Sequence, residues 1–227
     1  MSLIEPEKSD IESIIELFSK GKLNEALDSI NDQFKNFPKN PILHNIAGAC
    51  HAGLGEFSLA VKSYNQAISI KPDYAKAHYN LASAFHEQGQ LDQSINSYKT
   101  SLELDSNYAE AHNNLGNVFR ENGDLNNAIS CFESALKISP LYIESHFSLA
   151  LIFHEIGELD NMIKHLEESI SIKPDFAEAF NSLGIAYKKK GQFDHAVKCY
   201  EKALSIHPNF AEASNNLGNV YKELGNL

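Results

Sequence analysis

One glycine returns every 34 residues along this 227-residue chain and constrains its fold more than any other feature. Each copy is followed by one polar residue and then by a leucine or a phenylalanine. The seven copies are Gly21, Gly55, Gly89, Gly123, Gly157, Gly191 and Gly225. A fixed period of this length indicates an array of stacked repeats, in which each unit contacts only its neighbours. The sequence therefore predicts one elongated array rather than ordinary globular domains.

Each repeat contains two amphipathic segments with this glycine between them. In 109–140, apolar residues recur at helical spacing on both sides of Gly123, which predicts two helices of about 12–14 residues. The glycine favours the left-handed conformation that ends a helix, and a proline after the second segment stops that helix at most boundaries. The predicted units, within one array over 1–227, are 7–40 (degenerate), 41–74, 75–108, 109–142, 143–176 (irregular), 177–210 and 211–227 (truncated).

Polar and small residues at repeated places predict how the helices begin and pack. Caps at the helix starts are expected from Asn40, Asp73, Asn107, Asp175 and Asn209. Capping-box acids are expected three residues later, at Glu110, Glu178 and Glu212. Small residues that let the two helices of one repeat approach each other are expected at Gly48, Gly116, Gly184 and Gly218. The unit 143–176 is expected to be irregular because of Leu141, Met162 and Leu166.

The recurring positions resemble those of the tetratricopeptide repeat (TPR) family over nearly the whole chain. In the sixth repeat they read Phe180, Leu183, Gly184, Tyr187, Gly191, Ala196, Tyr200, Ala203 and Pro208. The family's usual tryptophan is replaced in four repeats by His44, His78, His112 and His146, one per unit, which indicates a packing position. The resemblance implies an all-α fold: a right-handed superhelix of stacked antiparallel helix pairs, or α-solenoid, with the first helices lining its concave side.

Asparagines recur at the positions that the resemblance places on this concave side. A side-chain amide offers both a donor and an acceptor, so it can pair with the backbone of an extended peptide. The pattern Asn-Asn-Leu-Gly-Asn at 113–117 and 215–219 resembles the repeats that precede the catalytic part of O-linked N-acetylglucosamine transferases, where a similar ladder binds extended peptide. The predicted peptide-binding residues are Asn80, Asn113, Asn114, Asn117, Arg120, Lys188, Asn215, Asn216, Asn219 and Lys222.

Two features leave the use of this ladder open. It is interrupted at Ser148 and Ser182, and the same asparagines can serve only to link neighbouring helices. Acids at the starts of the first helices and bases near their ends are either two edges of a groove or charges that complement the helix dipoles. Chaperone-binding members of the family grip a carboxylate with Lys and Arg. None of the matching residues here is basic, so binding of a chaperone tail is not expected; they are Tyr79, Ser83, Asn114, Glu144 and Ser148.

The composition argues against several functions. A net charge of −11 disfavours a sequence-independent grip on nucleic acid, and no stretch approaches the roughly 20 apolar residues of a membrane helix. The cysteines Cys50, Cys131 and Cys199 are expected to be free, as in a reducing compartment such as the cytoplasm. No zinc spacing, nucleophile motif or phosphate loop is present, so neither a cofactor nor a metal is expected.

The sequence thus predicts a non-enzymatic scaffold that binds proteins or extended peptides through an asparagine-lined groove, without nucleic acid or membrane partners. One alternative is the substrate-targeting part of a larger enzyme such as a glycosyltransferase, because the chain stops at Leu227, half-way through its seventh repeat. Another is a homo-oligomer that pairs through this uncapped C-terminal end.

Overall fold

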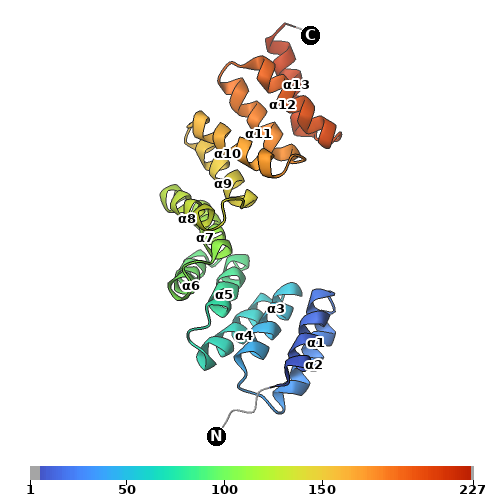
Figure 1. Cartoon of the computed structure of the whole chain (residues 1–227), viewed down its shortest axis with the longest axis vertical. Helices are drawn as coiled ribbons and strands as arrows, with labels where there is room; N and C mark the ends of the chain where they lie inside the picture. The colour runs from blue at the N-terminus through green and yellow to red at the C-terminus, as the bar shows by residue number, and fades with distance from the viewer. Residues whose placement is uncertain (1–5, 226–227) are drawn as a thin grey trace. The chain divides into compact units, whose positions relative to one another are not determined.

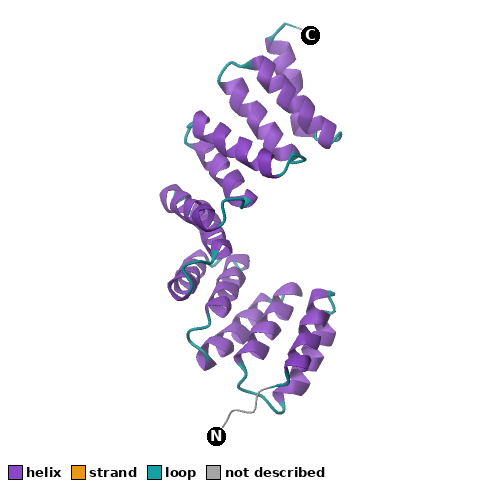
Figure 2. Ribbon diagram, in the orientation of Figure 1, coloured by secondary structure: helices purple, strands orange, loops and turns teal. Residues whose placement is uncertain are grey.

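The computed structural model describes residues 6–225, which contain thirteen α-helices and no strand (Figures 1 and 2). The helices are α1 (Lys8–Ser19), α2 (Leu23–Phe34), α3 (Pro41–Gly53), α4 (Phe57–Ile70), α5 (Ala75–Glu87), α6 (Leu91–Leu104), α7 (Ala109–Glu121), α8 (Leu125–Ile138), α9 (Ile143–Glu155), α10 (Leu159–Ile172), α11 (Ala177–Lys189), α12 (Phe193–Ile206) and α13 (Ala211–Glu223). Odd-numbered helices are the first helices of the repeats, and even-numbered ones are the second.

The chain divides into two compact units, Met1–Val118 and Phe119–Leu227. In the first unit, α3 packs on α4, α4 on α5, and α5 on α6. In the second unit, α9 packs on α10, α10 on α11, α11 on α12, and α12 on α13. Within each unit these helices contact the next one along the chain, as stacked helix pairs do, and the predicted all-α solenoid is confirmed.

The recurring glycine has the predicted conformation in every repeat. All seven copies have a positive φ, between 70° at Gly89 and 80° at Gly157, which L-residues with a Cβ rarely adopt. The N–H of the following residue donates back into the helix, as Glu56 does to the carbonyl of His51 at 2.8 Å. This bond closes the first helix and turns the chain so that the second can pack back.

The predicted N-caps are wrong except at Asn40, whose side chain accepts from the N–H groups of Ile42 and Leu43. Asp73, Asp175 and Asn209 each lie one residue before the observed cap position, and Asn107 lies two residues before α7 begins. The cap positions hold the aromatic residues Tyr74, Phe176 and Phe210, whose side chains make no capping bond. These rings make other contacts: Lys71 lies over Tyr74, and Phe176 packs on Phe147.

Two of the small residues allow the close helix approach that the sequence predicts. A Cβ built on Gly48 would lie 2.5 Å from Cε1 of Tyr64, and one on Gly184 would lie 2.5 Å from Cε1 of Tyr200. Gly116 is buried. The prediction stays untested for Gly218, where a Cβ would meet nothing within 4 Å, because no second helix of that repeat lies among the described residues.

The expected irregularity of 143–176 is also wrong. Its helices have 13 and 14 residues, as in every other repeat from the second to the sixth. Met162 and Leu166 are buried in the places where other repeats carry alanine and an aromatic residue, because any large apolar side chain can fill this space. All three cysteines are free, as predicted. Within 6–225, no helix has the length and apolar character needed to cross a membrane.

Candidate functional site

Neighbouring first helices are joined by one recurring hydrogen bond, which we call a rung. In a rung, the sixth residue of a repeat donates its side-chain N–H to the fifth residue of the preceding repeat. Three rungs are present: Asn80 to Asn45 Oδ1 at 2.9 Å, Asn114 to Tyr79 Oη at 2.9 Å, and Asn216 to Asn181 Oδ1 at 3.1 Å. The first two lie in the N-terminal unit and the third in the C-terminal unit, so the predicted link between neighbouring helices is present in both.

Each rung has a buried end and an open end. The acceptors Asn45, Tyr79 and Asn181 are buried, whereas the donors Asn80, Asn114 and Asn216 are half-buried. An asparagine side chain carries two N–H donors and a carbonyl with two lone pairs, and a rung uses one donor. The remaining groups of Asn80 and Asn216 are therefore held in a fixed position at the surface of the first helices, whereas Asn114 makes further bonds within its own unit.

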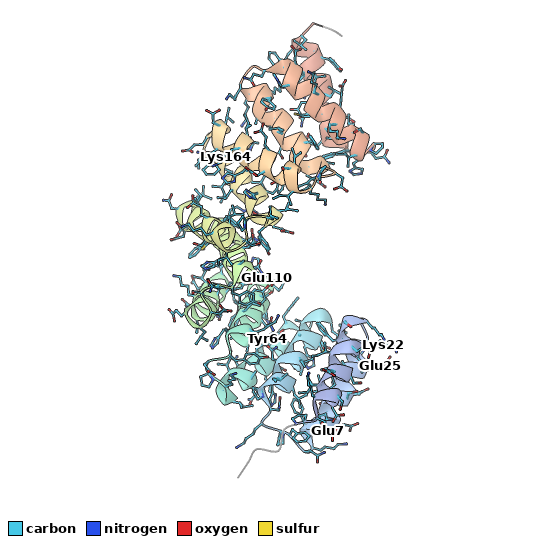
Figure 3. The ribbon with its side chains drawn as sticks, viewed as in Figure 1. Glu7, Lys22, Glu25, Tyr64, Glu110 and Lys164 are labelled. Atoms are coloured by element: carbon cyan, nitrogen blue, oxygen red, sulfur yellow. The ribbon has the colours of Figure 1, made fainter. Side chains whose placement is uncertain are left out.

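A glutamate extends two of the rungs into a three-residue network. Tyr79 Oη donates to Glu110 Oε1 at 2.7 Å, and Asn181 Nδ2 donates to Glu212 Oε1 at 3.1 Å. Glu110, labelled in Figure 3, lies in the first turn of α7. The capping-box prediction is therefore wrong for both glutamates, whose carboxylates accept from the preceding repeat instead. Burial and the Glu110 carboxylate raise the pKa of Tyr79, which keeps its hydroxyl protonated as a donor.

The other predicted binding residues differ in accessibility. Asn113 is buried and donates to Asn114 Oδ1 at 3.2 Å, so it positions its neighbour. Asn117 and Arg120 are half-buried, whereas Asn215, Asn219 and Lys222 are exposed. Lys188 is half-buried in an ion pair with Glu223 of α13, at 2.8 Å.

The three consecutive lysines at the end of α11 reach three different helices. Besides the Lys188 pair with α13, Lys189 donates to Nε2 of His154 at 2.7 Å, and Lys190 pairs with Asp160. Burial and then the nearby Lys189 charge lower the pKa of His154, which favours the neutral ring that accepts this bond. The basic edge at α11 is thus engaged in contacts within the C-terminal unit.

The step from α9 to α11 has an apolar contact in place of a rung. Its fifth-position residue is Phe147, whose ring packs against Phe176 with 4.8 Å between centroids. A phenyl ring offers no acceptor for an amide, and the sixth-position residue is Ser182. The predicted gap in the ladder therefore coincides with aromatic packing.

The four recurring histidines share one structural role. Each Nε2 donates to the backbone carbonyl six residues earlier, at the loop that precedes its helix. The pairs are His44 to Pro38 (2.9 Å), His78 to Pro72 (3.0 Å), His112 to Ser106 (3.2 Å) and His146 to Pro140 (3.1 Å). These bonds support the packing explanation of the series. In the described part of the chain, no group of three His, Cys, Asp or Glu side chains is placed to hold a metal ion.

His146 makes an additional contact that its three equivalents lack. Its Nδ1 lies 3.0 Å from Nδ1 of His165, and because its Nε2–H is already donated to Pro140, the neutral ring accepts from His165. Burial, followed by the influence of His146 and Lys164, lowers the pKa of His165 to about 4.

The first helices near the N-terminus carry exposed apolar side chains at several groove positions. Ile15, Phe18 and Ile42 are 48%, 37% and 40% exposed at positions of α1 and α3 equivalent to groove positions. A pocket of about 270 Å³ lies at the starts of these helices, lined by Pro6, Ile11, Asn40, Pro41, Ile42, Lys71 and Tyr74. This apolar part was not predicted from the sequence, although Ile46 in the place of asparagine indicated it.

Tyrosines beneath the first helices were missed as well. Tyr98 is buried, and its hydroxyl is hydrogen-bonded to Ser83 and to the rung donor Asn114. Burial raises the pKa of Tyr98 to about 12. The 34-residue period places Tyr79 where other repeats have asparagine, which could have identified it as a rung acceptor. The positions of these hydroxyls could not be deduced without the packing of the second helices.

The sequence model described as TPR repeat matches five overlapping stretches: 51–89, 82–123, 116–157, 151–191 and 186–225. The chain belongs to the TPR family. Among TPR relatives, the Hsp70-Hsp90 organising protein of Plasmodium falciparum is 35% identical over 69 residues, which are 30% of this chain and 27% of that protein. This chain therefore spans well under two thirds of that relative.

Solved TPR structures cover more of the chain. MamA is 30% identical, with a TM-score of 0.68 over 73% of this chain and 96% of MamA. YrrB is 17% identical, with a TM-score of 0.70 over 82% of this chain and 96% of YrrB. At the latter identity the likeness shows the TPR fold alone.

Proposed function

We propose that this TPR chain is a scaffold that binds an extended peptide segment of a partner protein along the first-helix faces of its units. The single observation that carries the proposal is the rung. It holds Asn80, Asn114 and Asn216 in place and leaves amide groups of Asn80 and Asn216 at the surface, whereas Asn114 also bonds to Asn113 and Tyr98. Groups held in place before binding lose little conformational freedom when a ligand pairs with them.

The chemistry of these faces fits a peptide backbone. Backbone N–H and C=O groups need acceptors and donors at regular spacing, and the side-chain amides provide both. The apolar surface at Ile15, Phe18 and Ile42, with the adjoining pocket, offers a place for a hydrophobic side chain of the same ligand in the N-terminal unit. YrrB, which has the same fold, is described as carrying an unusual peptide-binding site.

The proposal gives the chain no catalytic step of its own. The repeated Asn-Asn-Leu-Gly-Asn pattern supports a binding mode like that of the transferase repeats which it resembles. A soluble partner in the cytoplasm is consistent with the free cysteines.

The test begins with twelve-residue peptides selected from a random phage-displayed library on the immobilised protein. In the variant carrying Asn80→Ala, Asn114→Ala and Asn216→Ala, we expect the Kd of these peptides to rise at least tenfold, which corresponds to about 1.4 kcal/mol. Fluorescence polarisation with labelled peptides measures the change, and circular dichroism checks that the helix content is retained.

A matched control replaces exposed asparagines on second helices by alanine, at Asn65, Asn96 and Asn126. These variants should bind as the wild type does. Equal affinities of the rung variant and the wild type would show that the asparagines serve only to join the helices.

A further inference from the structure

Tyr200 in α12 is fully buried, and its hydroxyl has no hydrogen-bond partner within residues 6–225. A buried polar group without a partner is destabilising, because it has lost its bonds to water and gained none. Such groups are rare in native proteins and call for an explanation. The aromatic ring itself is well accommodated, since Ala196 and Val220 share its buried cluster.

An equivalent tyrosine three repeats earlier indicates where this hydroxyl lies. Tyr98 is hydrogen-bonded to Ser83 and Asn114, both on the first-helix face of the N-terminal unit. The 34-residue period puts Ile185 and Asn216 in the corresponding places around Tyr200. Isoleucine has no polar group to offer, so one partner of the hydroxyl is lost.

The contacts of Tyr200 agree with this placement. A Cβ built on Gly184 of α11 would lie 2.8 Å from the ring carbon Cζ that bears the hydroxyl, and Ile185 packs against the same cluster. The second expected partner, Asn216, donates to Asn181 at 3.1 Å and makes no bond to the Tyr200 hydroxyl. The Tyr200 hydroxyl therefore lies next to the first-helix face of the C-terminal unit.

We propose that Tyr200 and Asn216 form a binding site for the backbone of an extended peptide, in which the Tyr200 hydroxyl donates to a peptide carbonyl and Asn216 Oδ1 accepts from a peptide N–H. This site deepens the proposed function and rests on it. Both side chains keep the required groups after the Asn216 rung has formed. Access requires a rotamer change of Ile185, which is half-buried and packs against the cluster around Tyr200, and such changes are fast at a protein surface.

The charges around the site favour a neutral acceptor. Glu212 and Glu223 lie near Tyr200 and, after burial, contribute to raising its pKa, so the hydroxyl stays protonated. The same carboxylates repel an anionic ligand such as a phosphate or a terminal carboxylate. A backbone carbonyl carries no net charge and meets both requirements.

The variant Tyr200→Phe tests the site because it removes only the hydroxyl. Phe132 fills the equivalent place in the fourth repeat and is fully buried, so a phenyl ring fits there. For the free protein, we expect the melting temperature to stay the same or to rise, since an unpaired polar group is removed. The probes are library-selected twelve-residue peptides whose binding is weakened by Asn216→Ala, and their Kd should rise at least fivefold in Tyr200→Phe.

Tyr98→Phe is the control, because the hydroxyl that it removes has partners and its loss should lower the melting temperature. A similar decrease in Tyr200→Phe, or an unchanged Kd for peptides that depend on Asn216, would overturn the site while leaving the proposed function standing. Selection of no peptide at all would overturn the proposed function. Selection of peptides none of which depends on Asn216 would overturn this site alone.

Discussion

Replacing Gly184 by alanine is expected to lower the free energy of unfolding by about 1–3 kcal/mol, the usual cost of overpacking a filled core. The new Cβ would lie 2.5 Å from Cε1 of Tyr200, well inside the contact distance of two carbons. Tyr200 has no exposed surface and is held against Val220 of the next helix, so its ring cannot move away freely. Urea denaturation followed by circular dichroism measures the change as a shift of the midpoint.

Gly218→Ala is the matched control, one repeat further along the chain. A Cβ at this position meets nothing within 4 Å among the described residues, so only the helix propensity changes. Alanine in place of glycine inside a helix stabilises it by about 0.5–1 kcal/mol, so this variant should be slightly more stable than the wild type. The close-packing explanation fails if the two substitutions change stability in the same direction.

Acidification from pH 6.5 to pH 4 is expected to destabilise the folded protein through His165. The folded-state pKa of this residue is lowered to about 4 from 6.5, so between these values the unfolded chain binds the proton and the folded chain does not. Stability therefore falls as the pH falls through this window and is retained above it. A shift of this size corresponds to about 3 kcal/mol, and solvent screening of this partly exposed ring reduces the expected loss to about 1–2 kcal/mol.

His165→Ser isolates this contribution, because repeats two and three have serine at the equivalent positions Ser63 and Ser97. The carboxylates titrate in both proteins, so the informative quantity is the difference between their unfolding free energies as a function of pH. This difference should change by about 1–2 kcal/mol between pH 6.5 and pH 4. Parallel stability curves would show that the His146–His165 pair has no influence on acid stability.

The repeat period was sufficient to predict the helices and their order, because the glycine and the apolar spacing act locally within each 34-residue unit. The predicted cap positions were wrong because they depend on more than the local sequence. Phe176 packs against Phe147 of the preceding first helix, and this tertiary packing displaced the cap which local chemistry favours at Asp175. The packing role predicted for Gly218 stays a prediction, because it depends on a helix that is not among the described residues.

The candidate site was predictable as a set of positions but not as a network. The period placed Asn80, Asn114 and Asn216 in equivalent places, and the structure gives each a rung. The atom that each amide meets depends on the fifth residue of another repeat. The bond from Asn114 to Tyr79, and the bond from Tyr79 to Glu110, could therefore be identified only from the structure. The unpaired Tyr200 hydroxyl could not be predicted from the sequence for the same reason, since Ile185 and Tyr200 lie on different helices.

The rung also bears on how such an array can grow by gene duplication. A rung needs a donor at the sixth position of one unit and an acceptor at the fifth position of the unit before it. The unit 75–108 contains both, because Asn80 donates to the preceding unit while Tyr79 accepts from the following one. An in-frame copy inserted directly after it would find a compatible neighbour on each side, whereas a copy of 143–176, with Phe147 and Ser148, would not. Unequal crossing-over within 75–108 can therefore lengthen the array without breaking its helix-to-helix bonds.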